Sequence, residues 1–379
     1  MPPNNPFLIR GYAGPDYFCD RESETKRLVS ALRNDRDVTL VSPRRYGKTG
    51  LIHHVLRQLE SEMATVYMDI FQTHALAEFT SLFASSVVGA LESRTERTFS
   101  ALATFFRSCR PTITPQTDGF PKFSFDIAPA QADATLSEAF DYLARRDRRV
   151  VVAIDEFQQL AEYPEKGGEA MLRTLMLRVP NVHFVFAGSR QHLMREMFLS
   201  PRRPFYQSTD ILSLGVIVED KYYDFAAKHF SGAKKRLSRE AFSTLYNRFD
   251  GVTWYVQMGL NGLWGGTSES PTPEDVSMAV EDLVESRSLE YADLLNSQND
   301  ASQALLRGMA ADGAVPEPTS GAFLARAGIR AVSTAKSALD NLRRLDLVYH
   351  SPRGWIVYDR LFGEWLARHA PPTPQVPHS

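Results

Sequence analysis

Along the first 215 residues, short apolar runs alternate with segments whose apolar residues recur every three or four positions. Residues 150–154 are wholly apolar, which is typical of a strand buried on both faces of a parallel sheet. Residues 182–187 and 211–216 also predict strands, whereas the leucines and valines of 51–59 have helical spacing. This alternation predicts an α/β fold, a parallel sheet with helices on both faces.

After about residue 219 only the helical spacing remains, which predicts an all-helical region up to about residue 295. Helical segments and then two short strand-like runs follow up to about residue 367, and this order predicts a winged helix. We therefore expect an α/β domain, a helical lid domain, a winged-helix domain and a disordered tail, at residues 1–217, 218–298, 299–368 and 369–379.

One loop has the residue types of a phosphate-binding loop, or P-loop, and stands between a predicted strand and a predicted helix, as this motif requires. Gly47 lets the backbone approach a phosphate, Lys48 suits the β- and γ-phosphates, and the Thr49 hydroxyl suits Mg²⁺. Ser42 replaces the usual first glycine, and we interpret it as a variant that takes the turn with a negative φ. The alternative, a chance match on a basic surface loop, does not account for the strand and helix on either side. The candidate phosphate-binding residues are Ser42, Pro43, Arg44, Arg45, Tyr46, Gly47, Lys48, Thr49 and Gly50.

Two adjacent carboxylates, Asp155 and Glu156, follow the apolar run 150–154, at the edge where α/β sheets bind ligands. We expect Asp155 to hold Mg²⁺ and Glu156 to act as the general base that polarises the attacking water. Ser189 and Arg190 follow the next predicted strand and are candidates for contact with the γ-phosphate or the water. Ser189 as the N-cap of the following helix is an alternative that the sequence leaves open.

Composition adds limits rather than chemistry. A net charge of −2 gives no global basic field that would attract nucleic acid. Cys19 and Cys109 are the only cysteines, which argues against a disulfide framework. They are far apart in the sequence and lack the spacing of metal ligands. No apolar run approaches the length of a membrane span, and the first residues lack the features of a signal peptide. We expect a cytoplasmic protein without a membrane partner.

The chain resembles archaeal-type ATPases of the STAND class, relatives of AAA+ proteins. The resemblance rests on the stretches at 18–22, 42–49, 154–158 and 187–190, and on 358–362 with Trp365 and Leu366. It implies ATP and Mg²⁺ as ligands, with Phe18, Asp20 and Arg21 near the adenine. The lid segment of such proteins carries Gly-x-Pro, where this chain has Gly251-Val252-Thr253. An arginine that often follows the third strand is missing from 204–208, and Arg202 and Arg203 are possible substitutes.

Three functions compete. The leading one is a switch that binds and slowly hydrolyses ATP, with an unidentified protein partner and a possible homo-oligomer. The second is an ATP-dependent DNA-binding protein, similar to replication initiators or transposition helpers, that reads duplex DNA with a winged helix. The predicted helix 333–345 carries Lys336, Arg343 and Arg344, but Asp340 and Asp346 dilute this charge, so DNA is not favoured. The third, an inactive nucleotide-binding scaffold, conflicts with the complete set of P-loop and carboxylate residues.

Overall fold

The computed structural model describes residues 3–92, 102, 104–114, 122–351 and 353–369. They form two compact units. The first comprises Met1–His229 and Asp250–Met258, and the second Phe230–Phe249 and Gly259–Ser379. Among the described residues, none of the helices is both long and apolar enough to cross a bilayer.

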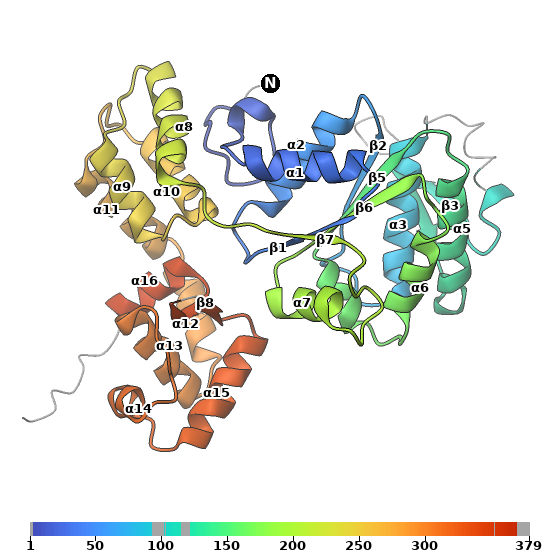
Figure 1. The fold of residues 1–379 in the computed structure, drawn as a ribbon. Helices are drawn as coiled ribbons and strands as arrows, with labels where there is room; N and C mark the ends of the chain where they lie inside the picture. Colours follow the sequence, from blue (N-terminus) through green and yellow to red (C-terminus); the bar gives the residue numbers. More distant parts are fainter. Residues whose placement is uncertain (1–2, 93–101, 103, 115–121, 352, 370–379) are drawn as a thin grey trace, which may run out of the picture. The chain divides into compact units, whose positions relative to one another are not determined.

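The described part of the first unit is built on a five-stranded parallel sheet with the order β2-β5-β6-β1-β7 (Figure 1). All of its neighbouring strands run parallel, so their carboxyl ends meet at one edge. The strands are β1 (Val38–Val41), β2 (Ala64–Asp69), β5 (Val150–Asp155), β6 (Val182–Gly188) and β7 (Asp210–Ser213).

Alternate side chains of β5 enter two separate cores, one on each face of the sheet. Val150, Val152 and Ile154 pack with one group of helices, whereas Val151 and Ala153 pack with the other. This double burial explains the wholly apolar run. Figure 1 shows the two layers. One consists of α1 (Glu22–Arg33) and α2 (Lys48–Leu59), and the other includes α3 (Leu76–Leu91), α5 (Ala132–Ala144), α6 (Gly168–Met176) and α7 (Gln191–Leu199).

Shorter elements and two helix starts complete the first unit. A hairpin of β3 (Arg110–Thr114) and β4 (Lys122–Asp126) precedes α5. The 3-10 turns are η1 (Pro15–Tyr17), η2 (Pro129–Gln131) and η3 (Phe157–Glu162). Helices α8 (Glu219–Gly232) and α10 (Thr253–Gly265) begin in this unit and continue into the second.

The second unit contains helices and a small β-hairpin. Its elements are α9 (Arg239–Arg248), α11 (Pro273–Glu285), α12 (Ser288–Asn296), α13 (Asp300–Asp312), α14 (Gly321–Ala327), α15 (Val332–Arg344), β8 (Val348–Ser351), β9 (Gly354–Val357) and α16 (Arg360–Arg368). Val315 pairs with Trp355 and adds a third strand position beside β9. Gly354 has a φ of +125°, and a Cβ there would collide with the Val315 backbone, so this wing requires glycine.

The predicted strands 150–154 and 182–187 and the helices of 219–295 are confirmed, with boundary shifts of a few residues. The strand predicted at 211–216 ends earlier, at Ser213. Helix α14, in the winged-helix region, is not among the predicted elements. The predicted disorder of 369–379 concerns residues outside the described part, apart from His369. The four domain boundaries stay predictions.

Candidate active site at the carboxyl edge of the sheet

The predicted site residues come from the ends of neighbouring strands. Val41, which precedes the P-loop, pairs in register with Gly188, which precedes Ser189. Asp155 pairs in register with Asp69 on the other side of β5. The sheet order β5-β6-β1 therefore brings the three predicted motifs to one edge, as expected for an open α/β sheet.

The P-loop turns sharply before α2. Gly47 has a φ of +88° and Arg45 a φ of +72°, both in the left-handed region. Ser42 is buried and its φ is not positive, in keeping with the conformation expected for a serine at this position. The loop therefore leads directly into the N-terminus of α2, where the free backbone N–H groups of the first turn favour binding of an anion.

Lys48 is folded back into the loop. Its Nζ donates to the backbone carbonyl oxygens of Ser42 and Pro43, each at 3.1 Å. Burial lowers the pKa of the ammonium, and the nearby carboxylates of Glu156 and Asp155 oppose this shift. The charge is thus held inside the phosphate-binding loop, next to the two predicted acidic residues.

Thr49 and Asp155 form a matched pair of oxygen ligands. The Thr49 hydroxyl donates to Asp155 Oδ2 at 2.6 Å, and the buried Asp155 also accepts from the Tyr67 hydroxyl at 3.3 Å. Mg²⁺ prefers oxygen ligands and usually keeps waters and phosphate oxygens beside one or two protein groups. A hydroxyl and a carboxylate beside a P-loop fit that requirement.

Glu156 lines the same cavity as the P-loop, has a φ of +54°, and its carboxylate accepts hydrogen bonds from two neighbours. Ser189 Oγ donates to Glu156 Oε2 at 2.7 Å, and Gln158 Nε2 donates to the same oxygen. Arg44 Nε donates to Ser189 Oγ at 3.3 Å. A chain of contacts therefore runs from the P-loop through Ser189 to the predicted general base.

Ser189 and Arg190 separate in the structure. Ser189 joins Glu156, whereas the Arg190 guanidinium forms an ion pair with Glu162. The N-cap of α7 is Arg190, without a side-chain cap bond, so the interpretation of Ser189 as that cap was wrong. Arg203 pairs with Glu169 at 3.1 Å.

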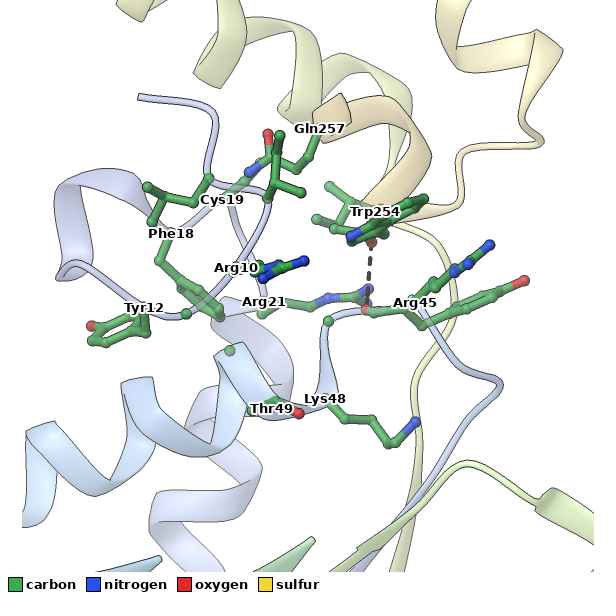
Figure 2. Close-up of a pocket in the computed structure, with 18 of the residues that line it drawn as sticks. Arg10, Tyr12, Phe18, Cys19, Arg21, Arg45, Lys48, Thr49, Trp254 and Gln257 are labelled. Carbon is green, nitrogen blue, oxygen red and sulfur yellow. Dashed lines mark hydrogen bonds between the residues drawn. The ribbon is translucent and has the colours of Figure 1, made fainter. Parts of the chain in front are cut away.

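The N-terminal segment supplies part of a cavity of about 450 Å³ beside the P-loop. Phe18 and Arg21 line this cavity (Figure 2), together with Trp254. Phe18 stacks on His54 with ring centres 4.2 Å apart. Asp20 is absent from the cavity lining, and its carboxylate pairs with Lys221 at 2.9 Å. The structure thus brings two of the three predicted adenine-side residues to the cavity.

Arg21 is almost fully buried and acts as a connector. Its guanidinium donates to the carbonyl oxygens of Tyr46 at 3.0 Å and Gly215 at 2.7 Å, and it pairs with Glu24 at 2.9 Å. It therefore ties the P-loop to the segment that leaves β7. A buried charge needs such partners, because an unpaired one is strongly destabilising.

Arg45 is directed at the start of α10. Its guanidinium carbon lies 4.4 Å from the centre of the Trp254 ring and 4.9 Å from that of Tyr255, whose hydroxyl also accepts a hydrogen bond from Arg45. The Trp254 backbone N–H donates to the Arg45 carbonyl at 3.0 Å. Thr253, in the predicted lid segment, contacts the Tyr46 carbonyl at 3.4 Å and lines the cavity.

Sequence reasoning missed several groups at this edge. Tyr67 and Asp69 end a strand that carries no recognised motif, and Trp254 lies far along the chain. Burial raises the pKa of Asp69, and the charges of Asp155 and Glu156 add to the shift. Their position could have identified Tyr67 and Asp69 as site residues, because they lie at the carboxyl end of a strand, where α/β sheets bind ligands.

Comparisons with known proteins agree with this geometry. Residues 18–258 match a family described as an ATPase domain found predominantly in Archaea, and residues 289–368 match a probable winged helix domain. No curated protein sequence matches the chain. The predicted parallel-sheet α/β P-loop fold, followed by a helical region and a winged helix, is confirmed.

Solved structures of similar fold extend over nearly the whole chain. A Walker-type ATPase of Pyrococcus abyssi has a TM-score of 0.65 at 16% identity, covering 95% of this chain and 99% of its own. The ORC2 protein of Aeropyrum pernix, with ADPNP and ADP, has 0.58 at 18% identity, covering 96% of each chain. The ORC1 protein of Aeropyrum pernix, in complex with DNA, has 0.55 at 15% identity, covering 97% of each.

Proposed function

The chain belongs to the family of ATPase domains found predominantly in Archaea, and we propose that it binds ATP with Mg²⁺ and hydrolyses it slowly as a molecular switch. The observation that carries this proposal is the contact between Thr49 Oγ1 and Asp155 Oδ2, at 2.6 Å, beside the loop that holds Lys48. A hydroxyl, a carboxylate and an ammonium meet there at a helix N-terminus, which suits a metal-bound triphosphate.

Each residue has a distinct part in the proposed reaction. Backbone N–H groups of the P-loop and the Lys48 ammonium would bind the β- and γ-phosphates, and Thr49 and Asp155 would hold Mg²⁺. The ion, when bound there, would supply positive charge beside the phosphate oxygens. Glu156 accepts the proton of the water that attacks the γ-phosphorus, and ADP leaves. The contacts of Ser189 with Arg44 and Glu156 support a role for this hydroxyl in sensing the γ-phosphate.

We further propose that the protein belongs to the STAND class, in which nucleotide state sets the arrangement of the lid and winged helix. Arg45 and Thr253 support a coupling of this kind, since they connect the P-loop to the first turn of α10. We also propose that Arg190 senses the γ-phosphate and that Arg202 or Arg203 replaces the arginine that is missing from 204–208. For these roles, Arg190 would have to leave Glu162 and Arg203 would have to leave Glu169.

The experiment compares wild type with Lys48→Ala and Glu156→Gln. Calorimetric titration with ATP and Mg²⁺ measures binding, and phosphate release measures turnover. We expect Lys48→Ala to abolish binding, whereas Glu156→Gln keeps binding and loses on the order of 10²-fold or more in turnover, because an amide accepts no proton. Near-wild-type affinity of Lys48→Ala would exclude the P-loop assignment, and unchanged turnover of Glu156→Gln would exclude Glu156 as the base.

A second candidate function is ATP-dependent binding of duplex DNA. It is favoured by the winged-helix match and by the exposed Lys336, Arg343 and Arg344 on α15, opposite its buried Ala335 and Leu342. The same exposed surface carries Asp340, so the charge is mixed. A mixed surface suits a protein contact at least as well as a phosphate backbone.

Titration of duplex DNA at several salt concentrations, with ATP and with ADP, separates the two candidates. DNA reading predicts that Arg343→Ala with Arg344→Ala weakens binding and lowers the slope of log K against log salt by about one unit per charge. Weak binding that is insensitive to both substitutions would leave the switch as the function. Size-exclusion chromatography in the same nucleotides reports any homo-oligomer.

A further inference from the structure

Gln158 places an amide inside an apolar layer. It is the second residue after Glu156, lies in η3 and is 2% exposed. Its neighbours Phe157 and Leu160 are buried hydrophobic residues of the same turn. A methionine or leucine would fill a similar volume there without a polar group, so the amide needs an explanation of its own.

One end of the amide has a clear partner. Gln158 Nε2 donates to Glu156 Oε2, the oxygen that also accepts from Ser189 Oγ at 2.7 Å. The orientation of the amide follows from charge, because a carbonyl oxygen turned toward a carboxylate would be repelled. Two donors, one following β5 and one following β6, therefore hold the same carboxylate oxygen.

The other end of the amide has no partner. Gln158 Oε1 is buried and accepts no hydrogen bond within the described residues. It lies against Gly188, where a Cβ would collide with Gln158 Oε1 and with Met194 Sδ. A buried carbonyl without a partner destabilises a fold, and such groups persist chiefly where they serve function.

We propose that Gln158 is a positioning residue for the general base. Together with Ser189 it fixes Glu156 Oε2, which leaves Oε1, free of hydrogen bonds from the described residues, to accept the proton of water. Glu156 lines the cavity beside the P-loop, where the proposed reaction would take place. This inference rests on the proposed hydrolysis of ATP.

The test uses Gln158→Met in the full chain, since methionine keeps the length of the side chain and removes the donor. We expect kcat to fall on the order of 10-fold, because the base loses its fixed geometry, with the KM for ATP and the Kd for ADP within about twofold of wild type. Introduced into Glu156→Gln, the same substitution should leave the residual turnover unchanged, because its effect passes through Glu156. Gln159→Met, the same change at the next residue, is the matched control and should keep wild-type turnover.

Two results would overturn the inference: wild-type kcat in Gln158→Met, or an equal loss of kcat with and without Glu156. If Gln158→Met does not fold, Gln158→Asn serves instead, since its shorter amide withdraws from Glu156. Failure of both variants to fold would make Gln158 a structural residue and would also overturn the inference. If Glu156→Gln alone turns over ATP at the wild-type rate, Glu156 is not the base and the inference fails while the proposed hydrolysis stands. Absence of ATP turnover in the wild type would instead overturn the proposed function.

Discussion

At the scale of single residues, two charged side chains are buried, and backbone carbonyl groups take the place of water as their hydrogen-bond partners. Lys48 and Arg21 are both buried, and each donates to two backbone carbonyl groups of the segments around the P-loop. These contacts give the ammonium and the guanidinium the hydrogen-bond partners that a buried charge requires.

A partly buried carboxylate at the opposite end of the sheet predicts a pH effect. Asp37 precedes β1, and its Oδ1 accepts from the Phe184 N–H at 2.7 Å. Burial raises the pKa of Asp37 to about 6, and the hydrogen bond from the Phe184 N–H and the charge of Arg173 oppose this shift. A folded pKa above the unfolded value means that protonation stabilises the fold. This stability is complete below about pH 4 and is lost as pH rises through about 6.

We therefore expect Asp37→Asn to unfold at higher urea concentration than wild type at pH 8, by roughly 1–3 kcal/mol in the free energy of unfolding. Asparagine keeps the acceptor for the Phe184 N–H and removes the buried charge. The difference between variant and wild type should shrink towards pH 4. A difference that is constant from pH 4 to pH 8 would contradict the buried-charge explanation.

At the scale of elements, the contact between the P-loop and α10 predicts coupled movement. Arg45 is enclosed by Trp254 and Tyr255, and the backbones of Arg45 and Trp254 are joined as well. Phosphate bound to the P-loop should therefore change the surroundings of the Trp254 indole. The measurement is fluorescence of a variant in which Trp264, Trp355 and Trp365 are replaced by Phe.

We expect ATP with Mg²⁺ to change the emission of Trp254 and Arg45→Met to abolish most of that change while nucleotide still binds. Arg44→Met is the matched control, because this neighbouring arginine donates to Ser189 Oγ. An emission change of equal size in Arg45→Met and wild type would show that Arg45 does not connect the two elements.

The same elements show what the sequence could predict. The strands, the P-loop and the Asp155–Glu156 pair depend on local patterns, so they could be placed before the structure was known. The partners of Arg45 and Arg21 could not, because they lie 210 and 194 positions further along the chain. The sequence predicts Arg45 at the phosphates, whereas its guanidinium donates to the Tyr255 hydroxyl. It predicts Asp20 at the adenine, whereas its carboxylate accepts from Lys221.

At the scale of the whole molecule, the proposed switch predicts that the solvent protection of the winged helix differs between the ATP-bound and the ADP-bound protein. Hydrogen exchange of residues 333–358, which include α15 and the β8–β9 hairpin, is the direct measurement. We expect protection to differ between ATP and ADP in wild type, and the difference to vanish in Lys48→Ala. Equal protection in ATP, in ADP and without nucleotide would contradict the switch.

The chain passes between the two compact units after residues 229, 249 and 258, and this path governs where it can be cut. A fragment that stops at residue 229 ends before Asp250–Met258, so the cavity beside its P-loop loses Thr253, Trp254 and Gln257. The helical excursion Phe230–Phe249 must stay in any fragment that keeps those residues, although it belongs to the other unit. The two units are therefore interleaved along the chain, and no single cleavage yields both of them intact.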